Sequence, residues 1–454
     1  MALGKRKKRK KQGEMFFTSA DLPKPKGHPF YKKVNKILKE ANFDEQVEEL
    51  AKPYYHEILG RPSLPPGVYL RLLFIGFFEG IESEREICWR CEDSFSLREF
   101  LGYSLTEDTP NHSTLSKTRQ RLPIEFHHLG FSIILSLLAE HDLVKGNVIG
   151  IDASTMEANA SMKSLVRRET KEDYNTYLEN LAKEAGIETP TKEDLARFDK
   201  KRKDKKMSND DWEHPHDPDS KITKMKDGTT KMAHKPEIAE DLETGAVLDV
   251  ELHPADEGDT TTGKKTLDEG IENLCVLCET GKLDSPKGIE TVADKGYHSG
   301  DYLLYLDEIR VKPCIAEPDR GRRRWTKNGV KTPEKAKEQR VVYKNRNRIR
   351  SEKGKKHHKK RAEIVERCFQ HILDSGGMRR TTLRGNENIL KRLLIHVAAF
   401  NLSLILRKVL GAGKPRYFAA CFCQFFHFIF RYIFLFSSIF ISKLPQENIF
   451  STQK

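Results

Sequence analysis

Two aspartates stand at the ends of short apolar runs in this sequence of 454 residues. Asp152 ends the run VIGID and Asp294 ends the run IETVAD. Short runs rich in valine and isoleucine, followed by small or turn-forming residues, predict buried β-strands. Both carboxylates are therefore expected at strand ends. Because carboxylate oxygens are ligands that Mg²⁺ and Mn²⁺ prefer, the pattern predicts a divalent-metal site at the edge of a sheet.

A third carboxylate is expected on a helix in RAEIVERCFQHIL, which holds both Glu363 and Glu366. The apolar face of this helix is formed by Val365, Cys368, Phe369 and Ile372. At about 100° per residue, Glu366 lies roughly 110° from the centre of that face and Glu363 roughly 170°. A ligand for metals beside a sheet is expected at the flank of the packed face. We therefore predict that Glu366 is the third carboxylate and that Glu363 faces solvent.

Asp152, Asp294 and Glu366 together suit metal-dependent phosphoryl transfer. Two divalent ions about 4 Å apart activate the attacking oxygen and stabilise the leaving oxygen of an in-line displacement. The protein then supplies position, and no side-chain nucleophile is required. A single aspartate is more often a helix cap or a surface charge, so the prediction rests on all three acids in basic surroundings. We expect them to hold two Mg²⁺ or Mn²⁺ ions.

The chain is basic, with 80 Lys and Arg against 67 Asp and Glu and a formal net charge of +13. This excess favours a polyanionic partner, although charge alone does not separate nucleic acid from acidic lipid. Hydrophobic residues make up 37% and charged residues 32%, which suits a soluble protein with charged insertions rather than a membrane enzyme. The opening MALGKRKKRKKQ has no apolar segment behind it and is not a secretory signal, so a cytoplasmic location is expected.

Residues 55–135 predict a helical module. One helix is expected in LPPGVYLRLLFIGFFEG, where Pro65 and Pro66 suit a helix start.

Further along, residues 156–230 are dense in Lys, Asp and Glu and predict a charged insertion. Next, AVLDVELH alternates apolar with polar residues, as a half-buried strand requires.

A short basic helix is expected in EDTPNHSTLSKTRQRL, with Ser113 or Thr114 as its cap. It carries Lys117, Arg119 and Arg121, which are the predicted DNA contacts of a helix-turn-helix-like reader. The alternative is an ordinary surface helix with solvated charges, because no base-reading pattern is visible in the sequence.

A second basic cluster lies in GGMRRTTLRG, which contains Arg379, Arg380 and Arg384. We predict that these arginines contact DNA phosphates, and the alternative is a set of solvated helix-end charges. The segment 320–361 is the most basic in the chain, and we expect it and the N-terminal basic run to add phosphate contacts.

Eight cysteines include the pairs Cys88 with Cys91 and Cys275 with Cys278, each spaced like half of a zinc site. Neither pair has a second half-site at zinc-finger spacing. Cys275 and Cys278 recur with leucines at helical spacing, which favours apolar residues on one helix face over zinc ligands. The histidines of HPHDPD are likewise expected in an exposed turn rather than on a metal.

These motifs resemble the DDE transposases of the insertion-sequence 1182 group, within the broader insertion-sequence 5 and 4 kin. GRPSLPPGVYLRLL through PNHSTLSKTRQRL is similar to their N-terminal DNA-binding region, although Asn111 stands where aspartate is frequent. IDASTMEANAS, VADKGYHSG and IVERCFQHILDSGGMRRTTLRG resemble the three catalytic blocks, which map their acids to Asp152, Asp294 and Glu366. The tyrosine and lysine of the related Y-R-E-K signature do not align cleanly.

The resemblance implies an α/β fold with an RNase H-like catalytic core, a mixed sheet flanked by helices, behind an N-terminal helical DNA-binding module. The expected boundaries are a basic tail at 1–14, the helical module at 15–135, the catalytic domain at 145–410 with its insertion at about 156–230, and a Phe-rich tail at 411–454. The expected partner is double-stranded DNA, as transposon ends and as target, bound by a homo-oligomer of the chain.

The Phe-rich stretch 417–441 is long enough to span a membrane. Arg431 falls near its middle, where a charge is costly, so we expect a packed or interfacial helix and no membrane partner. Two other functions remain open from the residues alone. One is a metal-dependent nuclease that cuts without joining ends, and the other is an inactive, transposase-derived DNA-binding protein.

Overall fold

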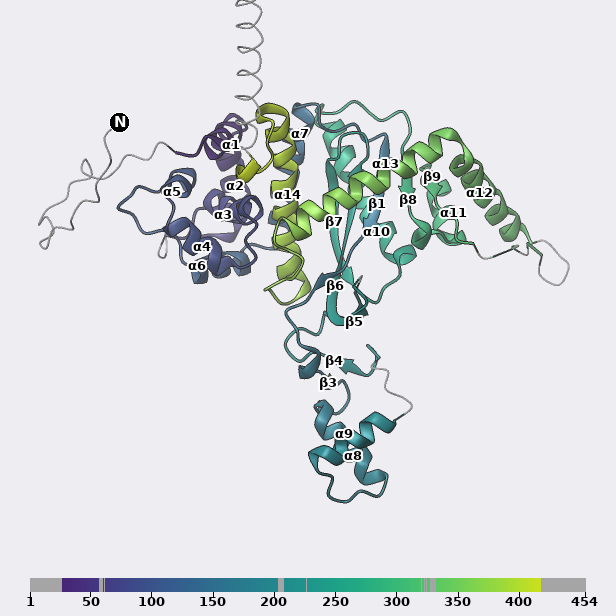
Figure 1. The fold of residues 1–454 in the computed structure, drawn as a ribbon. Helices are drawn as coiled ribbons and strands as arrows, with labels where there is room; N and C mark the ends of the chain where they lie inside the picture. Colours follow the sequence, from purple (N-terminus) through teal and green to yellow (C-terminus); the bar gives the residue numbers. More distant parts are fainter. Residues whose placement is uncertain are drawn as a thin grey trace, which may run out of the picture.

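The computed structural model describes residues 27–417, except 57–59, 61, 203–207, 226, 320, 322, 324 and 327–331. An N-terminal group of helices packs beside a mixed β-sheet that carries helices on both faces, and a small arm projects from one end of the sheet (Figure 1). The predicted basic tail at 1–14 and the Phe-rich stretch beyond Tyr417 lie outside the described residues.

The N-terminal region is helical, as predicted. Its α-helices are α1 (Pro29–Glu40), α2 (Phe43–Ala51), α3 (Pro66–Glu79), α4 (Glu84–Glu92), α5 (Phe95–Leu101), α6 (His112–Arg121) and α7 (Ile124–Glu140), with a 3-10 turn η1 (Lys52–Tyr54). Helix α3 begins at Pro66, where the missing N–H costs nothing, and ends at Gly80 in the left-handed region. Helix α6 is capped by Asn111, which accepts from Ser113 N at 3.0 Å, rather than by Ser113 or Thr114. Asparagine caps as well as the aspartate common at this position.

The main sheet is built around strand β1 (Val148–Ala153). On one side β1 pairs antiparallel with β6 (Thr230–Asp241), which pairs antiparallel with β7 (Val247–Pro254). On the other side β1 pairs parallel with β8 (Glu290–Ala293), which pairs parallel with β9 (Lys312–Ile315). Two short strands, β2 (Met156–Glu157) and β5 (Lys221–Lys224), extend the sheet along the free end of β6. The result is the predicted mixed sheet.

Helices cover both faces of this sheet. Helix α10 (Asp259–Glu279) packs on one face, and α13 (Glu352–Phe369) crosses the other. Helices α11 (Gly300–Glu308) and α12 (Pro333–Arg350) lie beside β9, with a 3-10 turn η3 (Lys295–Tyr297) before α11. The prediction of a half-buried strand at β7 is wrong, because the polar face of β7 is covered by α10. There Glu251 pairs with Lys265 at 2.9 Å, and His253 lies 3.1 Å from the Thr266 hydroxyl.

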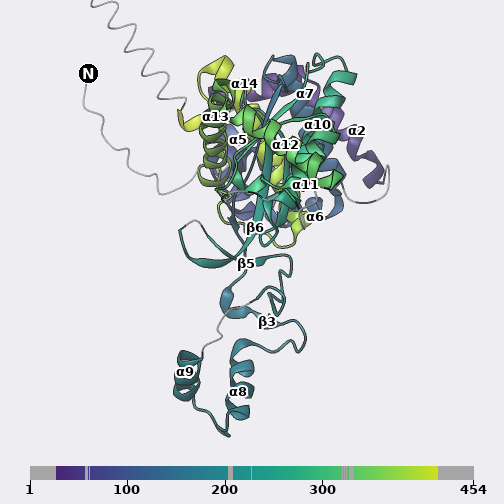
Figure 2. The same cartoon turned by 90° about the vertical axis from the view of Figure 1, so that its right-hand side faces the viewer.

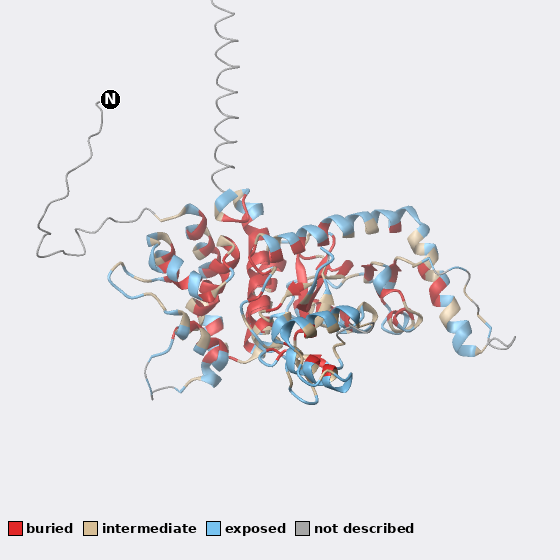
Figure 3. Ribbon diagram, turned by 60° about the horizontal axis from the view of Figure 1, so that its bottom comes forward, coloured by how far each residue is buried: buried red, intermediate tan, exposed pale blue. Residues whose placement is uncertain are grey.

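Helix α14 (Asn386–Leu410) joins the N-terminal helices to the sheet. It contacts α3 and α7 on one side and β7 on the other, and buried residues gather along it (Figure 3). Its length and hydropathy would suit a membrane span, but 94% of its most apolar window is buried inside the fold. It follows a π-helical turn η4 (Gln370–Asp374) at the end of α13. Its apolar surface therefore serves as the centre of the protein core.

The predicted insertion forms the projecting arm (Figure 2). It contains η2 (Met162–Ser164), β3 (Val166–Arg167), α8 (Tyr174–Glu184), α9 (Lys192–Lys201) and β4 (Trp212–Glu213). The arm has small cores of its own, in which the Arg167 guanidinium lies 4.9 Å from the ring centre of Tyr177 and 5.8 Å from that of Trp212. Because β2 and β5 belong to the main sheet, both ends of the insertion are anchored to the core.

The cysteine predictions are only partly confirmed. Cys88 and Cys91 are buried on α4, as expected of apolar residues. On α10 the expectation is wrong, because Cys275 is exposed and Cys278 is half-buried. Leu274 and Leu277 pack instead, so the buried face of α10 lies one residue away from the cysteines.

Candidate active site

Asp152 and Asp294 lie at the same end of two adjacent parallel strands. The pairing of β1 with β8 matches Gly150 with Val292, so two residues further along each chain the two aspartates stand level. Neighbouring strands are about 4.8 Å apart, which brings the two carboxylates to one edge of the sheet. The predicted strand-end positions of both aspartates are confirmed.

The backbone after β8 turns sharply at Asp294. Its Oδ1 accepts from Gly296 N at 2.7 Å and so caps the turn η3. A Cβ added to Gly296 would overlap the carboxylate of Asp259 and lie 3.0 Å from Asp294 Oδ1. The carboxylates of Asp259 and Asp294 therefore flank this glycine, and a side chain there would push the Asp259 carboxylate aside.

Two cations lie beside the carboxylates of Asp152, Asp259 and Asp294, which we call the acidic edge. Arg361 on α13 reaches Asp152, with 3.0 Å between Nη1 and Oδ2, and its side chain is 13% exposed. Lys235 on β6 reaches Asp259, with 2.6 Å between Nζ and Oδ1. The Arg361 Nε is buried without a hydrogen-bond partner among the described residues, so charge attraction holds this guanidinium more than a full set of hydrogen bonds does.

A buried carboxylate, Glu237 on β6, connects the parts of the edge. Its Oε1 accepts from Tyr297 Oη at 2.7 Å and from Thr262 Oγ1 at 2.9 Å, and its Oε2 accepts from Thr266 Oγ1 at 2.5 Å. Burial alone would raise the pKa of Glu237, but hydrogen bonds from His253, Thr266 and Tyr297 outweigh it and hold the pKa below the usual value. Glu237 therefore stays ionised inside the protein.

The network around Glu237 lies next to both aspartates along the chain. Glu237 is paired with Ala153, the residue after Asp152, while Tyr297 ends the turn that Asp294 begins. Burial and the neighbouring Glu237 charge raise the pKa of Tyr297 well above its usual value, so its hydroxyl remains a donor. The Glu237 side chain thus links β6, the strand next to that of Asp152, to the turn that Asp294 begins.

Glu366 is not brought to this edge. It is exposed on α13, whose face toward the sheet carries Arg361, Ile364, Val365 and Cys368. With Ile364 included among the buried residues, the centre of the packed face moves, and Glu366 lies roughly 130° from it at 100° per residue. Glu363 is also exposed and pairs with Arg367 at 3.8 Å, as predicted for a solvent-facing charge. The flank position predicted for Glu366 is therefore wrong in this conformation.

A different glutamate, Glu240, is buried between β6 and α13. Glu240 is 1% exposed, and burial raises its pKa well above the usual range, with the Cys368 thiol beside it. Burial that raises the pKa disfavours the charged form of this carboxyl group, which weakens it as a ligand for a cation. Glu240 therefore serves packing in this arrangement.

The acidic edge suits divalent cations in its donor set. Asp152 and Asp294 offer hard oxygen ligands side by side, and Arg361 and Lys235 lie where positive charge is required. No cluster of three His, Cys, Asp or Glu side chains within the described ranges forms a ready metal site. The two aspartates fit a metal, and a third carboxylate requires a shift of a neighbouring element.

The basic helix α6 presents two of its three predicted DNA contacts. Lys117 and Arg121 are exposed one turn apart, and the Arg121 guanidinium lies 5.1 Å from the ring centre of Tyr55. Arg119 is 6% exposed and forms a buried ion pair with Glu84. The prediction that Arg119 faces DNA is therefore wrong, because α6 turns this side chain into the helical core.

The three arginines of GGMRRTTLRG differ in their surroundings. Arg379 holds Asp374 at 2.7 Å and donates to Thr155 O at 3.2 Å, so it braces the chain that follows Asp152. Arg380 and Arg384 are exposed. Arg380 and Arg384 are therefore the more accessible of the three for the predicted phosphate contacts, whereas the partly exposed Arg379 is already paired with Asp374.

The HPHDPD turn, at residues 214–219, has a structural role. Asp217 accepts from Gly385 N at 3.1 Å and Asp219 accepts from Asn386 N at 2.9 Å. These carboxylates therefore cap the start of α14. Asp217 also pairs with buried His234 at 3.3 Å. The expectation of exposed histidines in this turn is confirmed for His216 and wrong for His214, which is 3% exposed.

The sequence did not single out Lys235, Glu237, Asp259, Tyr297 or Arg361. A signal for the first two was present in KMAHKPEIAED, where charged residues alternate through an otherwise strand-like stretch. Their partners come from three other elements, so the spacing of these residues along the chain does not predict that they cluster.

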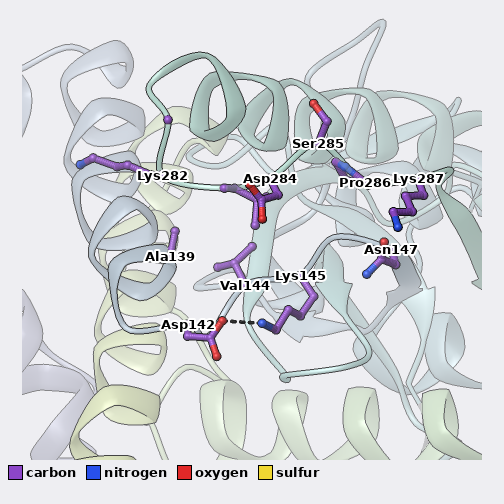
Figure 4. Close-up of a pocket in the computed structure, with 12 residues that line it drawn as sticks. Ala139, Asp142, Val144, Lys145, Asn147, Lys282, Asp284, Ser285, Pro286 and Lys287 are labelled. Carbon is purple, nitrogen blue, oxygen red and sulfur yellow. Dashed lines mark hydrogen bonds and ion pairs between the residues drawn. The ribbon is translucent and has the colours of Figure 1, made fainter.

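A hollow of about 420 Å³ lies at the opposite end of the sheet (Figure 4). It is lined by Asn147, just before β1, and by Lys145 and Lys287, with Lys145 paired to Asp142. Because Asp152 stands at the other end of β1, this hollow is separate from the acidic edge.

Comparison with known families agrees with the mixed sheet and the helical N-terminal region. The family described as Transposase domain (DUF772) matches residues 19–121, and the family described as Transposase DDE domain matches residues 209–402. The second match includes Asp294 and Glu366, and Asp152 precedes it. No curated protein and no solved structure matches the chain. The chain is therefore a DDE transposase, an enzyme that transfers phosphoryl groups on DNA, with a DUF772 transposase domain ahead of its DDE domain.

Proposed function

We propose that this transposase catalyses divalent-metal-dependent cleavage and strand transfer at the ends of an insertion sequence of the 1182 group. The observation that carries the proposal is the parallel register of β1 and β8, which puts Asp152 and Asp294 at the same end of two adjacent strands. The strand order β7, β6, β1, β8, β9, with only the first two connections antiparallel, supports an RNase H-like core. We further propose that it acts in the cytoplasm as a homo-oligomer on double-stranded DNA.

Asp152 and Asp294 would hold Mg²⁺ or Mn²⁺, with Glu366 as the third ligand. Two such ions, when bound, activate the attacking oxygen and stabilise the leaving oxygen. The chain itself fixes the distance between the aspartates through the sheet and the Glu237 network. Lys117, Arg121, Arg380 and Arg384 would hold the DNA by its phosphates.

Glu366 needs a change at α13 to reach the aspartates. The helix ends in the π-helical turn η4, a wide turn of the kind that concentrates at functional sites. Moving the register of this turn by one residue rotates α13 by about 100°, which brings Glu366 from roughly 130° to roughly 30° from the face toward the sheet. We propose that α13 adopts this second register when DNA and metal bind.

Three substitutions test the function: Asp152→Asn, Asp294→Asn and Glu366→Gln. Each keeps the shape of the side chain and removes a negative ligand, so each is expected to reduce cleavage and strand transfer at least 100-fold, of the order seen when a key electrostatic group is lost. DNA binding should remain within about twofold of wild type, since the basic residues are untouched.

Glu363→Gln is the matched control on the same helix. It is expected to be nearly silent, because Glu363 faces solvent and pairs only with Arg367 in this structure. Full activity of both aspartate variants would refute the proposed mechanism. Cleavage without joined products in the wild-type protein would instead identify a nuclease.

A further inference from the structure

A second basic hollow lies beside the acidic edge, where the arm joins the sheet. Its volume is about 410 Å³. Four segments line it: the chain from Glu157 to Ser164, the turn with His214 and His216, strand β6 at Lys231, and the loop carrying Arg380 and Arg384. None of the four segments contains Asp152, Asp294 or Glu366.

The backbone fixes the arginine loop against the first of these elements. Glu157 N donates to Arg379 O and Thr381 N donates to Glu157 O, each at 2.9 Å. Arg380 is thereby held between two backbone hydrogen bonds on a short parallel bridge. Asn159 Nδ2 donates to Thr382 O at 2.8 Å, and Arg384 Nε donates to Asn159 O at 3.3 Å. The hollow is therefore assembled before any ligand arrives.

The lining has an excess of positive charge. Lys231, Arg380 and Arg384 face one carboxylate, Glu157, which lies 2.6 Å from Lys231 Nζ and 3.7 Å from Arg380 Nε. Arg384 has no carboxylate partner among the described residues. Burial and the Arg384 charge lower the pKa of His214 in the same lining, so this ring is neutral at pH 7 and adds no charge. The formal charge of the lining is thus +2.

The hollow is close to the proposed reaction centre. Glu157 follows Asp152 by only five residues, and an extended chain spans at most about 3.6 Å per residue, so the two lie within roughly 18 Å. That distance corresponds to no more than about five base steps along B-DNA. A duplex whose scissile phosphate lies at Asp152 therefore carries further phosphates within reach of the hollow.

We propose that this hollow is a phosphate subsite for the DNA backbone flanking the scissile position, and that Glu157 is its internal counter-ion. In the free protein Glu157 occupies Lys231 and Arg380. A phosphodiester group entering the hollow would take these two cations and Arg384, and Glu157 would be the group displaced. The inference rests on the proposed function, since it takes DNA at Asp152 as its reference point.

Substitutions of Arg384 and Glu157 are predicted to change DNA affinity in opposite directions, and together they form the main test. The full-length protein is titrated with a fluorescent duplex of mixed sequence at several salt concentrations. Arg384→Ala should weaken binding and reduce the slope of log affinity against log salt by about 0.9, the value of one phosphate contact. Glu157→Gln should tighten binding, because the amide removes the competing charge and keeps the side-chain shape.

Arg197→Ala on α9 is the matched control. Arg197 is on the insertion, away from the residues that line the hollow; its side chain is 74% exposed, and its removal makes the same change in net charge. The proposal is overturned if Arg384→Ala binds like Arg197→Ala, or if Glu157→Gln weakens binding while its thermal unfolding matches wild type. If Glu157→Gln unfolds early, Lys231→Met replaces it and should weaken binding like Arg384→Ala, and wild-type binding by that variant also overturns the proposal.

The cleavage assay in the same preparations separates the two levels of inference. Loss of cleavage in Asp152→Asn with unchanged binding by Arg384→Ala leaves the proposed function intact and removes only the subsite. Normal cleavage by Asp152→Asn removes the proposed function, whatever the arginine variant does.

Discussion

The Tyr297 hydroxyl donates to Glu237 Oε1 at 2.7 Å, and this contact links the turn of Asp294 to the strand beside Asp152. Both side chains are fully buried, so no water replaces either partner. Tyr297→Phe removes a single oxygen. We expect it to reduce cleavage about 10-fold or more and to raise the Mn²⁺ concentration needed for half-maximal activity, because the two aspartates lose their fixed spacing.

Glu240→Gln is the control for this prediction. It alters another buried carboxyl group of β6, one whose pKa is raised by burial. It should leave the Mn²⁺ requirement unchanged. Tyr297→Phe is expected to lower the free energy of unfolding by about 1–3 kcal/mol. If it does so while the Mn²⁺ requirement stays unchanged, Tyr297 contributes to stability and not to the spacing of the aspartates.

Arg361→Ala should tighten Mn²⁺ binding by the DNA-free protein. Arg361 lies 3.0 Å from Asp152, and a divalent ion must compete with its positive charge. Calorimetric titration of the full chain with Mn²⁺ measures this effect directly. Lys360→Ala, which removes an exposed charge from the neighbouring position of α13, should have a much smaller effect. Equal or weaker Mn²⁺ binding by Arg361→Ala would contradict the competition.

Glu84→Ala is expected to destabilise the N-terminal helices by about 3–5 kcal/mol, because it leaves Arg119 charged and buried without its partner. Chemical unfolding followed by circular dichroism gives this value. Lys117→Ala on the same helix should leave stability within about 0.5 kcal/mol and weaken DNA binding instead. Reversed roles for these two positions would mean that α6 is rotated relative to the structure.

His127 makes the stability of the helical region dependent on pH. It is fully buried between Tyr69 Oη at 2.9 Å and Pro123 O at 2.8 Å, and burial lowers its pKa to about 3. The unfolded state therefore binds a proton below about pH 6.5, whereas the folded state resists it until about pH 3. The free energy of unfolding should fall by up to about 1.4 kcal/mol per pH unit between these values.

His127→Phe should flatten that part of the pH profile, while exposed His216→Gln should not. Thermal unfolding across pH 4 to 7 compares the three proteins. If the slope for His127→Phe equals that of wild type, another group carries the acid sensitivity.

Local patterns predicted strands β1, β7 and β8 and helix α3, since each is specified by a few contiguous residues. The two aspartates were found because each ends such a strand. Contacts between distant segments were not predictable in the same way. Arg119 has the sequence signature of a surface arginine, and it is buried because Glu84, 35 residues earlier, receives it.

Glu366 shows the same limit on a finer scale. Its distance from the packed face depends on which neighbours are buried, and Ile364 was not expected among them. The polar face of β7 was expected in solvent for a related reason, because α10, which covers it, folds back from a later segment. Periodicity reports which residues share a face and leaves open what covers that face.

The caps that Asp217 and Asp219 provide to α14 make the arm difficult to remove. Excising residues 158–229 would appear to delete only a projection, yet it would also take away the two carboxylates at the positive end of the central helix and the buried partner of His234. Shortened versions of this transposase should therefore retain the turn at 214–220 and trim only α8 and α9. Natural length variation in the arm is expected to follow the same boundary, with its tip free to change and its root retained for folding.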